Sequence, residues 1–310
     1  MSDAIPSNAG IEAMSIDRFS ERSGTGVVVF NDKMWVIAGE ENLEWKNDVW
    51  SSKDGKNWAL ETGSAEFCGR YNHKVFVFKD KLWLIGGADD SFCKLNDIWS
   101  SENGVSWRQE VIAERKGTSV VSLAYVFDSK FWLAFGSKGD LWSTENGSDW
   151  KLESNRYMYP KGVKDVVECG GKLWLFSKTD STSGNRVWSS EDGISWSLIE
   201  LNTPGFTDQK DLNVLLHKDE IWLFTYSSID ERAWLWTSKD GKSWTKKSGS
   251  IYFGNVDVED AYLVVFDNQL FVVGGNREIS VDDKDNWKSN ECLDWVDEAP
   301  KGFYSDVRFA

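Results

Sequence analysis

Short runs in which apolar residues alternate with polar ones recur along the whole chain, and each run predicts a β-strand. The run VVVF (27–30) is followed after three turn-forming residues by MWVIAG (34–39), and KVFVF (74–78) is followed in the same way by LWLIGG (82–87). Connections of this length join neighbouring antiparallel strands. Because no segment shows a sustained helical period, the pattern predicts an all-β protein.

The tryptophans indicate that these strands belong to a repeat. Six times, two tryptophans lie eight residues apart, and five of these pairs enclose a Ser/Thr-x-Asp/Asn-Gly segment. The pairs are Trp50 and Trp58, Trp99 and Trp107, Trp142 and Trp150, Trp188 and Trp196, Trp236 and Trp244, and Trp287 and Trp295. A further aromatic residue lies in the apolar run before each pair, at Trp35, Trp83, Trp132, Trp174, Trp222 and Phe271.

A unit of four antiparallel strands that recurs every 40 to 50 residues or so is typical of a β-propeller blade. The sequence therefore predicts an all-β, six-bladed β-propeller of four-stranded antiparallel blades. The expected blades are residues 25–62, 72–111, 121–154, 164–200, 212–248 and 260–298. We expect residues 1–24 to pack on the ring and residues 299–310 to supply a ring-closing strand, because an open sheet edge needs cover.

The charge balance narrows the range of partners. The chain has 35 Lys and Arg against 50 Asp and Glu, a net charge of −15. This is the wrong sign for binding nucleic acid or an anionic membrane, so we expect neither as a partner. No apolar run approaches the roughly 18 to 20 residues of a membrane span. The N-terminus does not resemble a secretory signal, which favours a cytoplasmic location.

The repeat resembles that of kelch-type propellers, such as the central domain of galactose oxidase. The resemblance covers about residues 25–298. It rests on an apolar strand ending in a diglycine, as at Gly86-Gly87 and Gly274-Gly275, then a variable loop, an Asn-Asp-Val/Ile-aromatic strand and an outer-strand tryptophan. Two of the six repeats keep both glycines, and the third-strand aromatic is Trp rather than the Tyr usual in kelch repeats.

The turn of each repeat also resembles the Asp-box of sialidase-like propellers. Its first copy is Ser52-x-Asp54-Gly55-x-x-Trp58. Glycine adopts a positive φ without steric cost, and short polar side chains bind the amides of the turn. In those families the motif lies away from the active site, so the resemblance implies fold and not activity. We expect a positive φ at the glycine of each copy, and an altered turn at Cys292, which takes the corresponding place in the sixth repeat. The five glycines are Gly55, Gly104, Gly147, Gly193 and Gly241.

Two loop tryptophans fall outside the repeat register, Trp45 and Trp234. Exposed aromatic residues without a repeat role are the best candidates for a binding hot spot. We expect Trp45, Tyr71 and Phe92 to form one patch across the first two blades. Trp234 either joins a binding surface or begins a strand. Aromatic residues that recur in the interblade loops, such as Phe19 and Phe67, are expected to pack between blades instead.

Basic residues precede the innermost strands of three blades, at Arg22, Arg70 and Arg115. They predict either an anion site at the axial opening, because the guanidinium group binds both oxygens of a carboxylate or phosphate, or interblade salt bridges. An enzyme of this kind would resemble kelch-type sialic-acid mutarotases. Its catalytic residues would be Arg70, Glu114 and Arg115.

Metal and redox sites are poorly supported. The only histidines are His73 and His217, which the strand pattern places on opposite sides of the disc, and no Cys-x-x-Cys pair occurs. We therefore expect no metal and no cofactor. The four cysteines are too few for a disulfide scaffold. Cys68 and Cys93 lie on loops of one face and pair only under oxidising conditions, so free thiols are expected.

The first functional hypothesis is a noncatalytic interaction scaffold, which binds a protein or glycan through the loops of one face. The alternatives are the sugar-active enzyme, tested by whether an Arg and a Glu converge at the axial opening, and a structural component of a larger assembly. A monomer is the expected oligomeric state.

Overall fold

The computed structural model describes residues 19–20, 22–113, 115, 119–136, 139–178, 185–202, 210–227, 232–247, 251–252, 262–267, 269–273, 287–290 and 294–297. Several expectations fall on other residues and so lie outside this description. They concern the two terminal segments, Glu114 and the turn at Cys292.

Antiparallel β-sheets form the described part of the chain, which contains no helix. The strands of the first three sheets are β1 (Gly26–Phe30), β2 (Lys33–Glu41), β3 (Glu44–Ser52) and β4 (Trp58–Thr62); β5 (Lys74–Phe78), β6 (Lys81–Ile85), β7 (Ile98–Ser101) and β8 (Arg108–Glu110); and β9 (Val121–Phe127), β10 (Lys130–Phe135), β11 (Leu141–Thr144) and β12 (Trp150–Ser154). The remaining strands are β13 (Val163–Cys169), β14 (Lys172–Lys178), β15 (Asn185–Ser190) and β16 (Ser197–Leu198); β17 (Lys210–His217), β18 (Glu220–Ser227), β19 (Arg232–Ser238), β20 (Thr245–Lys246) and β21 (Ile251–Tyr252); and β22 (Tyr262–Phe266), β23 (Gln269–Val273), β24 (Trp287–Asn290) and β25 (Asp294–Asp297).

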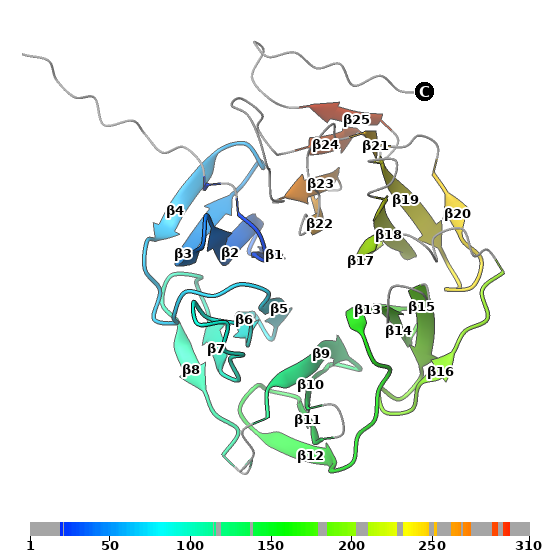
Figure 1. Ribbon diagram of the computed structural model, residues 1–310, viewed down its shortest axis with the longest axis horizontal. Coiled ribbons are helices and arrows are strands. Elements are labelled where there is room, and N and C mark those ends of the chain that lie inside the picture. The colour runs from blue at the N-terminus through cyan, green and yellow to red at the C-terminus, as the bar shows by residue number, and fades with distance from the viewer. Residues whose placement is uncertain are drawn as a thin grey trace, which may run out of the picture.

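The sheets are the blades of a propeller arranged around a central axis (Figure 1). Five of the described sheets are four-stranded blades, whereas the sequence predicted six. The sheet of β17 to β20 differs because β21 pairs with β19 beside the four-strand path, so it has five strands. The innermost strands contact one another in order, and β22 also contacts β1, so the ring of inner strands closes on itself.

The first two strands of a blade are joined by tight hairpins. Between β1 and β2, Asn31 and Asp32 both have positive φ angles, 49° and 54°, and Phe30 pairs with Lys33. Two positive φ angles are the requirement of a type I′ turn, whose twist matches that of the flanking strands. Gly170 and Gly171 meet the same requirement in the hairpin between β13 and β14. These turns set the register of the second strand.

In the first, second and fourth blades the tryptophan of the second strand packs against the turn glycine of the next blade, whereas Gly193 meets Tyr125 and Phe127 of the third blade. A Cβ atom placed on Gly104 would lie only 2.1 Å from the ring of Trp35, and one placed on Gly241 would lie 2.1 Å from Trp174. Phe271 makes the corresponding contact with Gly55 of the first blade. The repeated aromatic residues therefore fill the interfaces between blades, including the interface that closes the ring.

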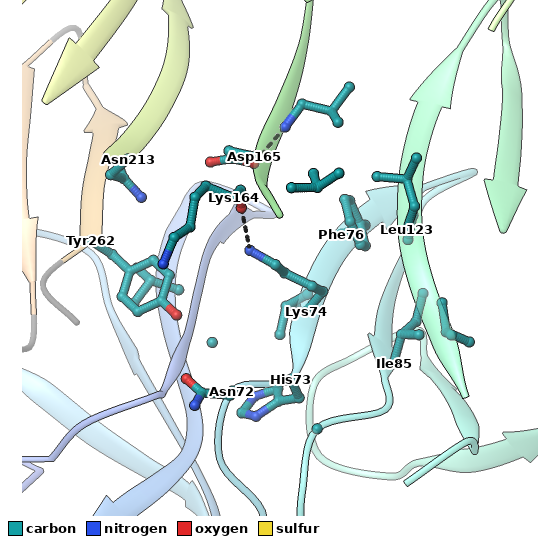
Figure 2. A pocket seen from close by; sticks show the side chains of 18 of the residues that line it. Asn72, His73, Lys74, Phe76, Ile85, Leu123, Lys164, Asp165, Asn213 and Tyr262 are labelled. Carbon is teal, nitrogen blue, oxygen red and sulfur yellow. Dashed lines mark hydrogen bonds between the residues drawn. The ribbon is translucent and has the colours of Figure 1, made fainter. Parts of the chain in front are cut away.

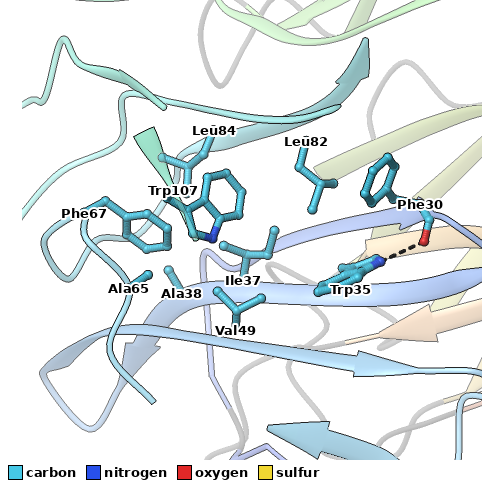
Figure 3. Packing of buried hydrophobic residues seen from close by; sticks show 10 residues of the cluster. All are labelled: Phe30, Trp35, Ile37, Ala38, Val49, Ala65, Phe67, Leu82, Leu84 and Trp107. Atoms are coloured by element: carbon cyan, nitrogen blue, oxygen red, sulfur yellow. Dashed lines mark hydrogen bonds between the residues drawn. The ribbon is translucent and has the colours of Figure 1, made fainter. Parts of the chain in front are cut away.

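Figure 3 shows this packing between the first two blades. Trp35 and Ile37 from β2 meet Leu82 and Leu84 from β6 and Trp107 at the outer edge of the second blade. The indole of Trp35 also donates a hydrogen bond to the carbonyl of Phe30, at 2.8 Å. The second strands are buried on both faces because a neighbouring blade covers each face.

The turn motif supplies the glycine against which these rings pack. Ser52 Oγ accepts a hydrogen bond from the amide of Gly55, and Asp54 Oδ1 accepts from Lys56 and Asn57. Burial raises the pKa of Asp54, but the hydrogen bonds from Asn57 and Lys56 outweigh it and lower the pKa to about 2. The predicted positive φ is confirmed at all five glycines, Gly55, Gly104, Gly147, Gly193 and Gly241.

The interblade aromatics are also buried as expected. Phe19 packs edge-on against Trp58, with 4.9 Å between ring centroids, and Phe67 packs in the same way against Trp107 at 5.3 Å. Both phenylalanines are buried. These recurrent rings therefore belong to the core and leave no open face for a ligand.

Gly104→Ala is expected to cost about 2 to 4 kcal/mol of stability in urea denaturation. Part of the loss comes from the positive φ of 75°, and the rest comes from the overlap of the new Cβ with Trp35. Gly171→Ala is the matched control, because Gly171 has φ 71° and no atom within 4 Å of the added Cβ. It should cost only about 1 to 2 kcal/mol. Equal losses in the two variants would mean that the Trp35 contact contributes nothing.

Candidate partner-binding site

The three aromatic residues expected to form a patch do lie together. Trp45 is in β3, Tyr71 precedes β5, and Phe92 lies in the loop between β6 and β7. Their ring centroids are 6.0 Å apart for Trp45 and Tyr71, 5.5 Å for Trp45 and Phe92, and 6.4 Å for Tyr71 and Phe92. All three contacts are edge-to-face, with interplanar angles of 72° to 89°. The cluster therefore joins the loops of the first two blades.

Backbone contacts hold Trp45 against the second blade. The amide of Arg70 donates to the carbonyl of Lys46 at 3.1 Å. A Cβ on Gly69 would lie 2.1 Å from the carbonyl oxygen of Trp45, so only glycine permits this close approach. Tyr71 and Ala88 exchange two backbone hydrogen bonds, which fix Tyr71 beside the loop that carries Phe92.

An aspartate builds the loop that presents Phe92. Asp89 Oδ1 accepts hydrogen bonds from the amides of Ser91 and Cys93, and the amide of Phe92 donates to the Asp89 carbonyl. Phe92 has a φ of 57° and its side chain is 65% exposed. A bulky residue such as phenylalanine rarely adopts a left-handed backbone conformation, and such residues cluster at functional sites. Phe92 is therefore a candidate binding residue.

A fourth apolar residue, which the sequence analysis missed, is exposed on the same hairpin as Trp45. Leu43, at the tip of the β2–β3 hairpin, is 74% exposed and lies two residues before Trp45. Trp45 and Tyr71 are half-buried beneath the more exposed residues. We call Leu43, Trp45, Tyr71 and Phe92 the loop-face patch. An apolar residue in a predicted hairpin tip was the signal that could have identified Leu43.

Acidic residues surround the loop-face patch. Glu40 pairs across the hairpin with Trp45, and Glu41 pairs with Glu44. Asp89 and Asp90 precede Phe92 in its loop, and the basic Lys94 follows it. Lys46 forms ion pairs with Glu41 and Glu44, at 2.9 and 2.6 Å. The hydrogen bond to Glu44, followed by that to Glu41, raises the pKa of Lys46. Most of the acidic charge therefore remains uncompensated at this surface.

Arg22 and Arg70, which were candidate ligand-binding residues, have structural contacts instead. Arg70 is completely buried and forms a bidentate pair with Asp97, at 2.7 and 2.8 Å. It also donates to the carbonyl of Gly86 at 2.9 Å. Arg22 forms the equivalent pair with Asp48 in the first blade, at 2.6 and 3.2 Å. Since these groups are buried and engaged, we do not retain either arginine as a ligand-binding or catalytic residue.

The other two candidates also lie in local packing contacts. The Arg115 guanidinium lies 3.7 Å from the centroid of the Phe135 ring and donates to the carbonyl of Ser119. Trp234 is half-buried in β19, where the ammonium of Lys246 lies 3.0 Å from the centroid of its ring. Trp234 is thus a residue of strand β19 and is not part of the loop-face patch.

A second site, which is polar, lies at the ring axis. The sequence analysis did not identify its lysines. Figure 2 shows Lys74, Lys164 and Asp165 around the cavity between the inner strands. His73 lines the same cavity. Burial, with the charge of Arg70 second, lowers the pKa of His73 to about 3, so the imidazole is neutral at physiological pH. Within the described residues, no group of His, Cys, Asp and Glu is arranged to hold a metal ion.

The three cysteines that the structure describes are free thiols. Cys68 and Cys93 are exposed free thiols, and Cys169 is buried and free. Burial raises the pKa of Cys169. None of the described residues forms a helix that is both long and apolar enough to cross a membrane.

Comparison with known proteins supports the fold alone. No family model matches the chain, and no curated protein matches it. Among solved structures, the chain is similar to the structure of YjhT, with a TM-score of 0.59 and 12% sequence identity. The match covers 87% of this chain and 95% of that one. At this level of identity, the similarity places the chain among β-propellers.

Proposed function

We propose that the protein is a noncatalytic, kelch-type interaction propeller that binds a protein partner through the loop-face patch. In this proposal the five-stranded sheet is the sixth blade of the ring. The observation that carries the proposal is the cluster of Trp45, Tyr71 and Phe92, which lies outside the repeated packing positions. Clustered aromatic anchors are the usual source of binding energy in protein interfaces.

The geometry of the patch favours a protein over a glycan. A sugar ring stacks on a flat, open aromatic face, whereas the rings here meet edge-to-face and two of them are half-buried. The exposed groups are the side chains of Leu43 and Phe92. Two protruding apolar side chains are better suited to packing against the side chains of a protein than to stacking on a sugar.

The surrounding charge specifies the partner further. Carboxylates of the β2–β3 hairpin and of the Phe92 loop border the patch, and the whole chain has a net charge of −15. Complementary charge accelerates association and disfavours the wrong partners. The proposed partner therefore presents an apolar anchor flanked by basic residues.

Peptide binding tests this proposal. Peptides with one Trp, Phe or Leu flanked by Lys and Arg should bind the protein, measured by fluorescence anisotropy, and matched peptides flanked by Glu should not. Phe92→Ala should weaken binding of the best basic peptide by about tenfold or more, or about 1.4 kcal/mol. Its melting temperature should stay almost unchanged because the side chain is exposed.

Met158→Ala is the matched control, since Met158 is 67% exposed on the interblade loop between β12 and β13. It should bind as the wild type does. The proposal is wrong if both variants bind alike or if acidic peptides bind equally well. Binding of glycans that Phe92→Ala abolishes, without binding of basic peptides, would replace the protein partner with a sugar.

The sugar-active enzyme has less support. Its candidate residues were Glu114 with Arg115 or Arg70, and Arg70 is buried against Asp97. Glu114 lies outside the described residues. The axial cavity instead presents lysines, which suggest a different chemistry.

A further inference from the structure

The cavity at the ring axis is formed jointly by all the inner strands. Its lining includes residues of β1, β5, β9, β13, β17 and β22, and its volume is about 350 Å³. This volume lies at the lower end of the range for small-molecule sites. Because each inner strand contributes at its N-terminal part, the cavity lies toward the face that also carries Tyr71 and the loop-face patch.

Two lysine side chains enter this cavity, and the charge of one of them, Lys74, acts on Asp165 in the same wall without forming an ion pair. Lys74 Nζ donates to the backbone carbonyl of Lys164 at 3.4 Å, and the side chains of both lysines extend into the space between the strands (Figure 2). Within the described part of the chain, neither ammonium group forms an ion pair. Carboxylate partners are available elsewhere, where they pair with Lys33, Lys46, Lys81, Lys130, Lys151, Lys172 and Lys239.

The nearby carboxylate is directed to the backbone instead. Asp165 Oδ1 accepts from the amide of Val166 at 2.9 Å, and its Oδ2 accepts from the amide of Val214 at 3.3 Å. Through the second bond Asp165 connects β13 to β17. Two ammonium groups face one carboxylate across the cavity, so the charged groups that line it have a net positive charge inside a strongly acidic protein.

A buried polar side chain lies in the same wall. His73 is 2% exposed, and neither ring nitrogen has a hydrogen-bond partner in the described part of the chain. The backbone of Ile37 lies close enough to the ring to favour its protonated form, and Gly26 packs against Nε2. Buried polar atoms normally have a partner, so this imidazole favours a polar occupant of the cavity, water included.

We propose that the axial cavity binds a small dianion, either a dicarboxylate or a phosphate, between the ammonium groups of Lys74 and Lys164. An ammonium group is a compact charge that suits either anion. Asn72, beside His73, adds an amide to the cavity wall. This site is distinct from the loop-face patch, and the inference does not depend on the proposed protein partner.

Isothermal titration calorimetry with a matched pair of ligands tests the inference. Succinate should bind at least tenfold more tightly than monomethyl succinate, which has lost one negative charge. Lys74→Met and Lys164→Met should each reduce succinate affinity to the level of the monoester. Lys74→Arg should restore binding to within a few-fold of the wild type. Lys151→Met is the control, because Lys151 lies on outer strand β12, and it should bind succinate unchanged.

The affinity for inorganic phosphate, compared with that for succinate, distinguishes a phosphate ligand from a dicarboxylate ligand. Tighter binding of succinate supports a dicarboxylate, and tighter binding of phosphate supports a phosphate ligand. The inference is overturned if neither dianion binds, if succinate binds but its monoester binds equally well, or if Lys151→Met weakens binding as much as Lys74→Met does. Thermal melts of each variant confirm that the comparison is made between folded proteins.

Discussion

Trp83→Ala is expected to lower the free energy of unfolding by about 3 to 5 kcal/mol, a large part of the stability of an ordinary domain. Trp83 is 2% exposed and donates its indole N–H to the carbonyl of Phe78 at 3.0 Å. Its ring packs against Phe131 of the third blade, and a Cβ on Gly147 would lie 2.6 Å from it. Truncation would therefore open a cavity between two blades and leave the Phe78 carbonyl without this donor.

Chemical denaturation measures the loss, and Phe92→Ala is the control for removing an aromatic side chain that is exposed. The control should change stability by less than about 1 kcal/mol. A loss below about 1 kcal/mol in Trp83→Ala would show that the repeated tryptophans do not hold neighbouring blades together.

Arg70→Ala is expected to cost a similar amount, about 3 to 5 kcal/mol, for an electrostatic reason. The substitution leaves the Asp97 carboxylate, whose side chain is only 16% exposed, without its bidentate partner. It also leaves the carbonyl of Gly86 without a donor. Lys172→Met removes one partner of an exposed pair, with Glu191, and should cost less than about 1 kcal/mol.

The pH dependence of stability gives this prediction a second readout. Burial raises the pKa of Asp97, but the hydrogen bond and charge of Arg70 outweigh it, so the pKa lies below its ordinary value of 3.8. The pair therefore contributes stability above about pH 4 and loses it as the pH falls through the lower folded-state pKa. The difference between wild type and Arg70→Ala should be largest at neutral pH and should narrow in acid. A difference that is constant with pH would contradict the ion-pair account.

The repeat could be predicted because its tryptophans recur at regular intervals along the sequence. Trp35, Trp83 and Trp174 occupy the same position in each blade, and in the structure they make the same contact with the next turn glycine. The extra strand β21 was not predictable, because two residues, Ile251 and Tyr252, carry no periodic pattern.

The sequence analysis left the arginines open between an anion site and salt bridges, because it did not identify the acidic partner of each arginine. Asp48 and Asp97 stand two residues before Trp50 and Trp99, and each pairs with the arginine that precedes its own blade. Asp140 stands in the same position before Trp142, and its charge acts on Arg115. This co-occurrence of Arg and Asp was visible in the sequence and indicates a structural pair.

The axial lysines could not be recognised in the same way. Lys74 and Lys164 lie 90 residues apart at the starts of separate inner strands, and only closure of the ring brings them to one cavity. Trp45, Tyr71 and Phe92 were recognised because they depart from the repeat, whereas Lys74 and Lys164 are ordinary residues for exposed strand ends.

Hydrogen exchange with the best basic peptide bound tests the central claim, that the loop-face patch is where this propeller binds its partner. The account predicts slowed amide exchange at the tip of the β2–β3 hairpin and in the loop around Phe92, with no change on the outer strands β12 and β16. Protection on the outer strands, or protection confined to the inner strand starts around the axial cavity, would contradict it.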